Sequence, residues 1–520
     1  MSDDRARPLG AVPARSTVFT DAFDAAATSF EKAEFDLAGA FLHFAEPSGR
    51  PNRGRHALLA ARLERQHGDA TACFEGGMLA SKDHPESAGR LTGLALAAAA
   101  ARRLARDDVA DRLFARIRRE AAADVRPETA LAAYLAGTDS WARADYAAAE
   151  AAIVAHAALP QPDLGIRSLQ GWIAVKRERY REAGARFAEA LASPSPGFYS
   201  GVYERANTLH AALVIAAETA DLPLGKRLRR VYESLPWKRS LARLKFLSLV
   251  NLRFLCLLEG DRKAAWFLAR EATQIAPTPP HRIMAEIDAA VSSRLLGDDA
   301  ACRLQFERAW QLVRAQRWGD ATEEERVALS DFAAEAAHEM PAEARQAITL
   351  YRSLRAKRAA DSSLDDDVRV EAFTSLAFAR VDEAMGDRAS ALERYRRALE
   401  CYERIGLNLR IAIVAADLYR LTRDERYDAL VKKTMARAPK AWILTHPSLA
   451  DALGPKARDV LARLLLGQSA KAAASELGRS TYTVTNHTRR IFEVFEVRSR
   501  DELRAKCAKL GITPATLRRP

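Results

Sequence analysis

The chain has 520 residues, more than one hydrophobic core usually serves, so we expect several domains or a core built by repetition. Hydrophobic residues make up 48% and charged residues 28%, a balance that excludes wholesale disorder. The net charge of +12 is concentrated near the C-terminus, because residues 453–520 hold 14 basic and 6 acidic residues. Such a basic segment favours contacts with phosphate groups.

The sequence predicts a cytoplasmic protein that does not span a membrane. Residues 1–19, which we expect to be flexible, lack the apolar segment of a signal peptide, and the longest nearly apolar run, residues 91–101, is too short to cross a bilayer. The five cysteines lie far apart and form no CxxC pair, so neither a disulfide framework nor a zinc site is indicated. We expect buried packing thiols, and neither a metal nor a cofactor.

Residues 20–436 are predicted to be helical throughout. They are rich in Ala, Leu, Arg and Glu, and apolar residues recur at three- and four-residue spacing between prolines and Gly-Asp pairs. In a recurring unit, small and aromatic residues follow a turn glycine at helical spacing, and four copies stand out. They are Gly386-Asp387 with Ala391, Tyr395 and Ala398; Gly297-Asp298 with Cys302, Phe306 and Ala309; Gly260-Asp261 with Ala265, Ala269 and Ala272; and Gly171 with Tyr180, Ala183, Phe187 and Ala190.

This unit resembles the tetratricopeptide repeat, whose small residues let two antiparallel helices approach closely while the aromatic fills the gap to the next pair. The intervals drift, from 37 residues between Gly260 and Gly297 to 89 between Gly297 and Gly386, so we expect a degenerate array with insertions or irregular pairs. Aromatic residues such as Trp141 and Trp172 are expected to pack in the core. No Walker A, GxSxG or GxGxxG motif occurs, and we do not predict an enzyme.

A domain of different organisation is predicted after a linker at residues 437–449. Residues 450–512 should form four short helices, at about 455–466, 470–477, 481–496 and 500–510, with a tail at 513–520. The middle pair has helix-turn-helix spacing, because Ala474 is small where the helices cross and Gly478 stands where the turn needs a positive φ. Serines should cap three of the helices: Ser469, Ser480, and Ser499 in a capping box with Glu502.

This domain resembles the LuxR/GerE helix-turn-helix family over about 55 residues without a gap. The matching residues are Leu453, Pro455, Arg458, Val460, Leu461, Leu464, Gly467, Ser469, Lys471, Ala474, Leu477, Gly478, Ser480, Thr483, Val484, Asn486, His487, Ile491 and Val497 to Leu503. The resemblance implies a bacterial-style transcription regulator whose third helix enters the major groove of double-stranded DNA.

The resemblance also assigns a DNA-binding surface. Its residues are Lys471, Ser480, Thr481, Tyr482, Thr483, Thr485, Asn486, Arg489 and Arg490. Asn486 has the donor and acceptor pair for an adenine edge, whereas Thr481, Arg489 and Lys471 are better placed for phosphates. Val484 and Ile491, and with them His487, are expected on the buried face. Arg489 and Arg490 could instead simply be a solvated helix face.

Departures from the family pattern leave a second reading open. Ala457 and Ala472-Ala473 replace the usual Glu and Glu-Ile, Arg479 replaces an aliphatic residue, and Thr485 replaces a frequent Lys or Arg. In this alternative, the chain is a helical-repeat interaction scaffold with a degenerate, non-DNA-binding helix-turn-helix domain. The sequence reveals neither the operator nor whether transcription is activated or repressed.

Two partners are predicted besides DNA. Leu503, Cys507 and Leu510 would form an apolar stripe on the fourth helix, which could contact a second copy in a homodimer or pack back on its own domain. The concave groove of the repeats is expected to bind a peptide, protein or small-molecule effector. The segment from Pro439 to Pro447 is the expected joint between the repeats and the DNA-binding domain.

Overall fold

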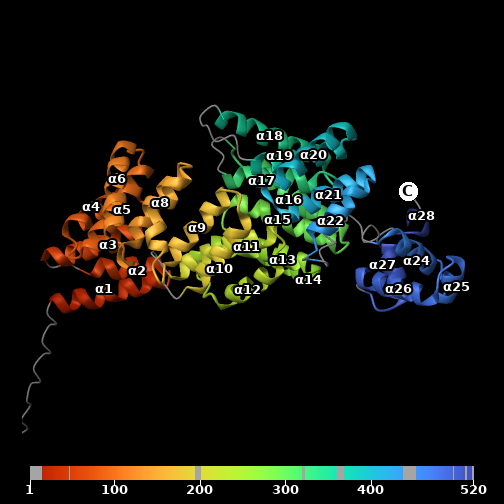
Figure 1. Ribbon diagram of the computed structural model, residues 1–520, viewed down its shortest axis with the longest axis horizontal. Helices are drawn as coiled ribbons and strands as arrows, with labels where there is room; N and C mark the ends of the chain where they lie inside the picture. Colours follow the sequence, from red (N-terminus) through yellow and green to blue (C-terminus); the bar gives the residue numbers. More distant parts are fainter. Residues whose placement is uncertain are drawn as a thin grey trace, which may run out of the picture. The chain divides into compact units, whose positions relative to one another are not determined.

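The computed structural model describes residues 15–45, 47, 49–193, 201–318, 323–359, 368–436, 438, 453–495, 497–509 and 512–517. Within these ranges the regular structure is helical and contains no strand, which confirms the all-helical prediction (Figure 1). No helix in the same ranges is long and apolar enough to cross a membrane. The expected joint at Pro439 to Pro447 lies outside the described residues.

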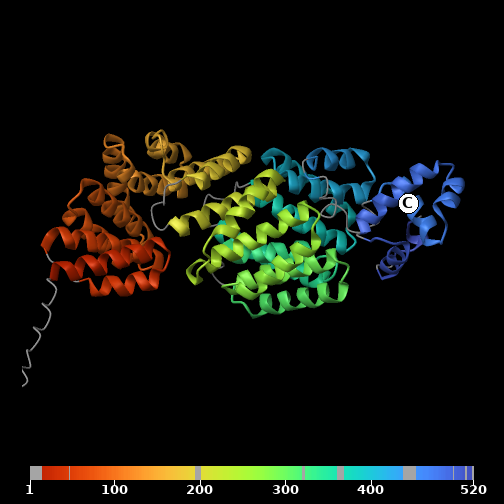
Figure 2. The same cartoon turned by 90° about the horizontal axis from the view of Figure 1, so that it is seen from below.

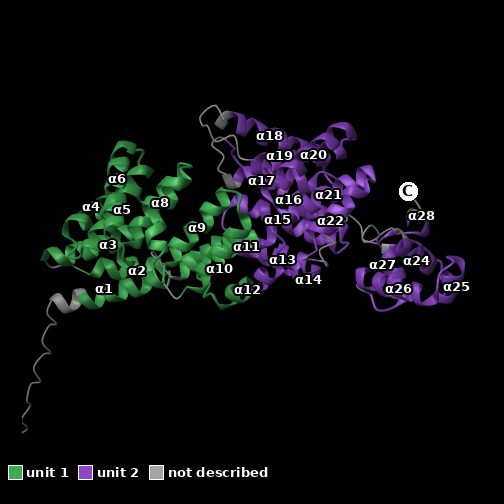
Figure 3. Cartoon of the chain, viewed as in Figure 1, with its two compact units in different colours: residues 1–215, 228–245 green, residues 216–227, 246–520 purple. Residues whose placement is uncertain are grey.

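The chain divides into two compact units, a division that the sequence did not predict. Unit 1 holds residues 1–215 and 228–245, and unit 2 holds residues 216–227 and 246–520 (Figure 3). Unit 1 contains α1 (Arg15–Glu31), α2 (Phe35–Phe44), α3 (Gly49–His67), α4 (Ala70–Asp83), α5 (Ser87–Arg103), α6 (Asp107–Ala123), η1 (Pro127–Thr129), α7 (Ala130–Ala142), α8 (Tyr146–Ala157), α9 (Leu164–Lys176), α10 (Tyr180–Ala192) and η2 (Arg239–Leu241).

Three helices have residues in both units: α11 (Gly201–Glu218), α12 (Leu222–Ser234) and α13 (Ala242–Leu258). The repeats continue in unit 2 with α14 (Arg262–Ile275), α15 (Pro279–Leu295), α16 (Asp299–Ala315), α17 (Glu323–Ala336), α18 (Pro341–Ala359), α19 (Val368–Ala384), α20 (Arg388–Ile405), α21 (Asn408–Thr422) and α22 (Glu425–Thr434). Consecutive helices pair as hairpins, and the first helices of successive hairpins, such as α15, α17 and α19, pack side by side (Figures 1 and 2).

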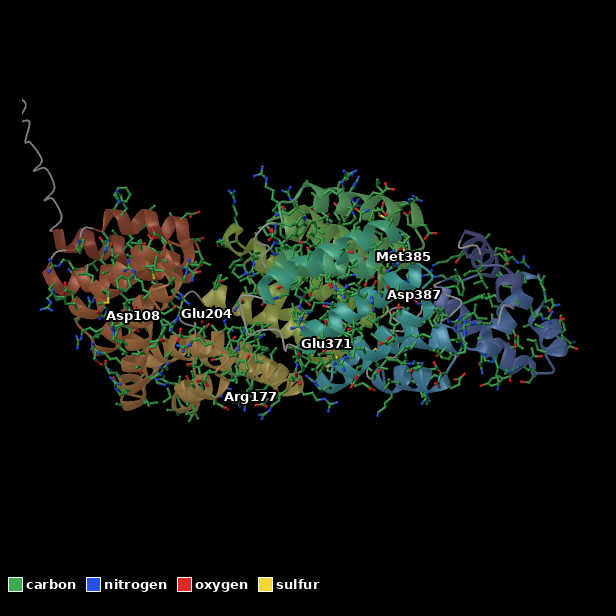
Figure 4. All side chains as sticks on the ribbon, turned by 90° about the horizontal axis from the view of Figure 1, so that it is seen from above. Asp108, Arg177, Glu204, Glu371, Met385 and Asp387 are labelled. Carbon is green, nitrogen blue, oxygen red and sulfur yellow. The ribbon has the colours of Figure 1, made fainter. Side chains whose placement is uncertain are left out.

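Ten of the described hairpin turns share one backbone feature, a residue with positive φ between the two helices. These residues are Ala33, Gly68, Ala105, Ala144, Glu178, Ala220, Gly260, Gly297, Gly386 and Arg423. In many of the turns an aspartate follows and caps the second helix; Asp387, which is labelled with Met385 in Figure 4, accepts a hydrogen bond from the Ser390 amide at 3.1 Å. The left-handed residue reverses the chain, and the aspartate satisfies a free N–H of the new helix.

The repeat positions predicted from the sequence lie in the core. Ala391, Tyr395 and Ala398 are fully buried on α20, and so are Phe306 and Ala309 on α16. In the hairpin of α9 and α10, a Cβ placed on Gly171 would lie 2.6 Å from the ring of Phe187, so only glycine allows this approach. The prediction of helical repeats, with small and aromatic residues packed between the helices, is therefore confirmed.

The long interval between Gly297 and Gly386 contains a complete hairpin. Helices α17 and α18 pack against each other there, and their turn has no positive-φ residue. It closes instead on the amide of Met340, which donates to the carbonyl of Ala336 at 2.8 Å, immediately before Pro341 begins α18. The repeat is thus continuous through this interval, although its turn signal is absent from the sequence.

Unit 2 also contains a contact between helices far apart in the chain. The guanidinium of Arg410, on α21, donates to both carboxylate oxygens of Glu218, at the end of α11, with distances of 2.9 to 3.1 Å. Asn408 donates its side-chain amide to the carbonyl of Thr219 at 3.3 Å. These contacts join the last repeat hairpin, α21 and α22, to the end of α11, where unit 2 begins.

Candidate nucleic-acid interface

The C-terminal domain is a small helical bundle with its own core. Its helices are α24 (Pro455–Leu465), α25 (Ala470–Glu476), α26 (Thr481–Phe495), α27 (Arg500–Lys509) and α28 (Pro514–Leu517). The first four agree with the predicted ranges to within a residue at each end. Val460 and Leu461 of α24, Val484 and Ile491 of α26 and Leu503 of α27 form much of the core, and each is at most 1% exposed.

The turn between α25 and α26 has the predicted chemistry. Gly478 adopts φ +60°, and a Cβ there would meet no atom within 4 Å. The positive φ, and not a lack of space, therefore favours glycine at this position. Ser469 accepts a hydrogen bond from the Ala472 amide at 3.1 Å, and Ser480 accepts one from the Thr483 amide at 3.1 Å. Both serines therefore cap their helices, which fixes where α26 begins.

The capping box before α27 differs in one detail from the predicted form. Ser499 accepts from the amide of Glu502 at 3.1 Å, as expected. The carboxylate of Glu502, however, accepts from the amide of Arg498 at 2.8 Å, one residue before the cap. The reciprocal pair still satisfies two backbone donors at the start of the helix.

Helix α26 has one buried and one exposed face. Val484, Ile491, Val494 and Phe495 point into the core and are fully buried. The predicted DNA-binding residues with exposed side chains are Lys471, Ser480, Thr481, Tyr482, Thr485, Asn486, Arg489 and Arg490, while Thr483 is half-buried. Tyr482 is 77% exposed, a high value for an aromatic side chain. Thr481, Tyr482, Thr485, Asn486, Arg489 and Arg490 thus share the exposed side of α26, and Lys471 and Ser480 are exposed on α25 and in the turn.

Local contacts on this surface orient several of its side chains. The Thr485 hydroxyl donates to the carbonyl of Thr481 at 2.9 Å, and the Ser480 and Thr483 hydroxyls lie 2.8 Å apart. The guanidinium of Arg490 lies 3.5 Å from the carboxylate of Glu493, an exposed pair that is easily exchanged for a phosphate or base contact.

His487, which we expected on the buried face of α26, is half-buried. Its partial burial lowers the pKa of the imidazole, and the positive charges of Arg479 and Lys456 lower it further. The ring is therefore neutral near pH 7 and adds no charge to the surface.

Three arginines of the domain bind its own backbone and side chains. Arg458 donates to the carbonyl of Leu453 at 2.8 Å, and Arg500 donates to the carbonyl of Gln468 at 3.2 Å. Arg463 forms an ion pair with Glu476 at 2.5 Å. The count of basic residues in the sequence did not separate these structural charges from those on the α26 surface.

Leu503 and Cys507 of α27 do not form an exposed apolar stripe that a second copy could contact. Leu503 is 1% exposed and Cys507 is fully buried, and both belong to the core of their own domain. Burial also raises the pKa of the Cys507 thiol to about 11. Of the two alternatives, these side chains pack on their own domain. The spacing of apolar residues along a helix does not show whether the same domain or a second copy buries them. Leu510 lies outside the described residues.

The comparisons with known proteins agree with this geometry. Residues 451–505 match the model of the family described as bacterial regulatory proteins, luxR family, or GerE. The C-terminal domain is a GerE domain. Its matched range contains α24, the helix-turn-helix pair and the first residues of α27. No curated protein matches the chain.

Many solved structures match the chain, and two that cover most of it are only distantly similar. The apo form of RapI is 10% identical, with 82% of this chain and 97% of that chain covered and a TM-score of 0.33. A chain of the Naa15/Naa10 structure bound to HypK-THB is 14% identical, with 96% and 89% covered and a TM-score of 0.21. The helical-repeat architecture therefore rests on the hairpins of this chain.

Proposed function

We propose that this protein is a DNA-binding transcription regulator in which α26 reads the major groove and the helical repeats dock a partner or sense a ligand. The observation that carries the proposal is the division of α26 into a fully buried apolar face and an exposed polar face, within a GerE domain. A capped helix of this kind presents side chains to base edges at fixed positions.

The residues on the exposed face have separable roles. Asn486 and Arg490 are proposed to contact base edges, since an amide matches adenine and a guanidinium matches guanine. Lys471, Thr481 and Arg489 are proposed to contact phosphates and set the register of the domain on the duplex.

Selection of bound genomic fragments followed by gel shifts would test this proposal with the full chain. Asn486→Ala combined with Arg490→Ala should weaken binding to a selected site at least about tenfold, because each base contact is worth roughly 1–3 kcal/mol. Arg504→Ala, which removes an exposed charge from α27, should have a much smaller effect. A folded double variant that binds the selected site as tightly as the parent would refute the groove assignment.

Salt dependence separates phosphate contacts from base contacts. Lys471→Ala combined with Arg489→Ala should weaken binding to all fragments and reduce the slope of log K against log salt by roughly 2, since about one counterion is released for each neutralised phosphate. An unchanged slope would remove these two residues from the phosphate-binding set.

The second candidate function is an interaction scaffold whose helix-turn-helix domain no longer binds DNA. The replacement of a frequent basic residue by Thr485, on the exposed face of α26, favours this alternative. Absence of salt-sensitive binding to any genomic fragment, with the domain folded, would support it over the regulator.

A dimer on paired half-sites remains part of the proposal, because one recognition helix reads few base pairs. Leu503 and Cys507 cannot supply its contact surface while the domain core is intact. A footprint over a single half-site with one chain bound would refute the dimer. Removal of residues 1–435 should change DNA affinity if the repeats control it.

A further inference from the structure

The first helices of the unit 2 hairpins, α15, α17, α19 and α21, carry a network of charged side chains that the DNA-binding proposal does not use. On α17, Glu335 lies 3.0 Å from Arg294 of α15 and 2.8 Å from Arg380 of α19. Arg380 also lies 3.4 Å from Asp417 of α21. The first helices of successive hairpins are therefore joined by ion pairs on the side where they face one another.

One carboxylate within this network is not paired. Asp331, one helical turn before Glu335 on α17, forms no hydrogen bond or ion pair among the described residues, and its side chain is half-buried. Four charged groups act on its ionisation: Glu335 of the same helix, and Arg410 of α21, Asp288 of α15 and Glu218 of α11. Three of these four are carboxylates, and Arg410 is already bound by both oxygens of Glu218.

Asp288, on the neighbouring helix α15, provides a second, independent sign of unmet bonding. It is 8% exposed, and its Oδ1 binds the guanidinium of Arg253. Its Oδ2 is buried and has no hydrogen-bond partner among the described residues. A buried carboxylate oxygen without a partner is costly, and buried polar groups are ordinarily satisfied.

The network already holds one guanidinium, that of Arg410, between a carboxylate and two aromatic rings. The Arg410 guanidinium binds Glu218 and lies 4.7 Å from the ring centre of Phe373 and 5.8 Å from that of Phe254. Both rings are half-buried. Carboxylates beside aromatic faces stabilise a cation by charge and by the ring quadrupole together.

We propose that Asp331, supported by Asp288, binds the guanidinium or ammonium group of a ligand on the face formed by the first helices of the unit 2 hairpins. The ligand class is a cationic molecule, either a basic side chain of a peptide or a small organic amine. Binding is independent of the DNA-binding proposal, whereas a role of this ligand as an effector of DNA affinity rests on it.

The ionisation of Asp331 gives the site a recognisable pH dependence. Burial above all, together with the carboxylates of Asp288, Glu335 and Glu218, raises the pKa of Asp331 to about 7 against the opposing charge of Arg410. By contrast, Arg380 and Arg294 outweigh burial and hold the pKa of Glu335 at about 2. A cation should expel the proton from Asp331, so its affinity should rise about tenfold from pH 6 to pH 8.

Calorimetric titration of the full chain without DNA would test the site with three probes: acetyl-Gly-Arg-Gly-amide, the same peptide with citrulline in place of arginine, and agmatine. The arginine peptide or agmatine should bind at pH 7 and release about half a proton per site, and the citrulline peptide should not bind. Binding of the peptide alone would assign a peptide source, and equal binding of agmatine would assign a small amine. No binding of either cation, or equal binding of the citrulline peptide, would overturn the proposal.

Two matched substitutions distinguish a ligand-binding carboxylate from a structural one. Asp331→Asn should abolish binding and raise the thermal midpoint of the free chain, because it removes an unpaired charge. Glu335→Gln should lower the midpoint, because it breaks two ion pairs. Glu307→Gln removes a half-exposed carboxylate of α16 that lies 3.3 Å from Arg303 of the same helix, so it should leave cation binding unchanged and shift the midpoint far less. Retained cation binding by Asp331→Asn would overturn the proposal even if DNA binding were established, and loss of DNA binding would leave it standing.

Discussion

The approach of α9 to α10 can be tested by adding one methyl group. In Gly171→Ala the new Cβ would lie 2.6, 2.7 and 2.8 Å from three atoms of the Phe187 ring. Carbon atoms pack at about 3.5–4.0 Å, so the ring or a helix must move by close to 1 Å. Phe187 has no free space to enter, because it is fully buried and stacks edge-on against Trp172 with ring centres 5.6 Å apart.

The expected cost is a difference of two terms. Overpacking of a filled core costs roughly 1–3 kcal/mol, whereas alanine in place of glycine inside a helix returns about 1 kcal/mol. We therefore expect a net loss of about 1–2 kcal/mol from the free energy of unfolding. Urea titration followed by tryptophan fluorescence measures it, and Phe187→Leu in the same chain should restore part of the loss.

Gly39→Ala is the matched control within unit 1. Gly39 also lies inside a helix, α2, but a Cβ there would meet no atom within 4 Å. It should therefore stabilise the chain by up to about 1 kcal/mol. If Gly171→Ala were as stabilising as Gly39→Ala, close packing would not be the reason for glycine at position 171.

Three further predictions concern caps, core and pH. Val484→Asp should abolish amide protection across residues 453–509 in hydrogen exchange, because it buries an unpaired charge, and retained protection would contradict the core assignment. Ser469→Ala should weaken α25 by about 1 kcal/mol, seen as faster exchange, whereas the exposed Ser475→Ala should not. Burial lowers the pKa of His156 below 6.5, so the unfolded chain takes up a proton at this residue before the folded chain does, and stability is lost as the pH falls below 6.5. His156→Gln should therefore flatten the plot of unfolding free energy against pH in that range.

The GerE domain was predictable almost residue by residue because its signals are local. Ser469 and Ser480 cap helices from adjacent positions, and Gly478 marks the turn between them. It was harder to predict which surface buries an apolar side chain. The spacing of Leu503 and Cys507 defines an apolar stripe, but only the packed bundle shows that the same domain covers it.

The repeats were less visible because several turns hide their backbone conformation. Ala105, Ala144 and Ala220 adopt the positive φ that glycine adopts at Gly260 and Gly297. Alanine in this region costs about 1–2 kcal/mol, so a reader of the sequence expects helix there instead of a turn. The charged network of unit 2 left no sequence signal at all, since its members lie on helices that are separated by a whole hairpin.

The contact between Arg410 and Glu218 alters how unit 2 should unfold. In an open solenoid each repeat contacts only its neighbours, so the array can fray from either end and its stability is close to a sum over neighbouring pairs. A bidentate bridge between residues 218 and 410 links the two ends of the unit 2 repeats. Loss of a terminal hairpin then also removes a support from the first helix, which favours cooperative unfolding of the unit and, through its high contact order, slower folding.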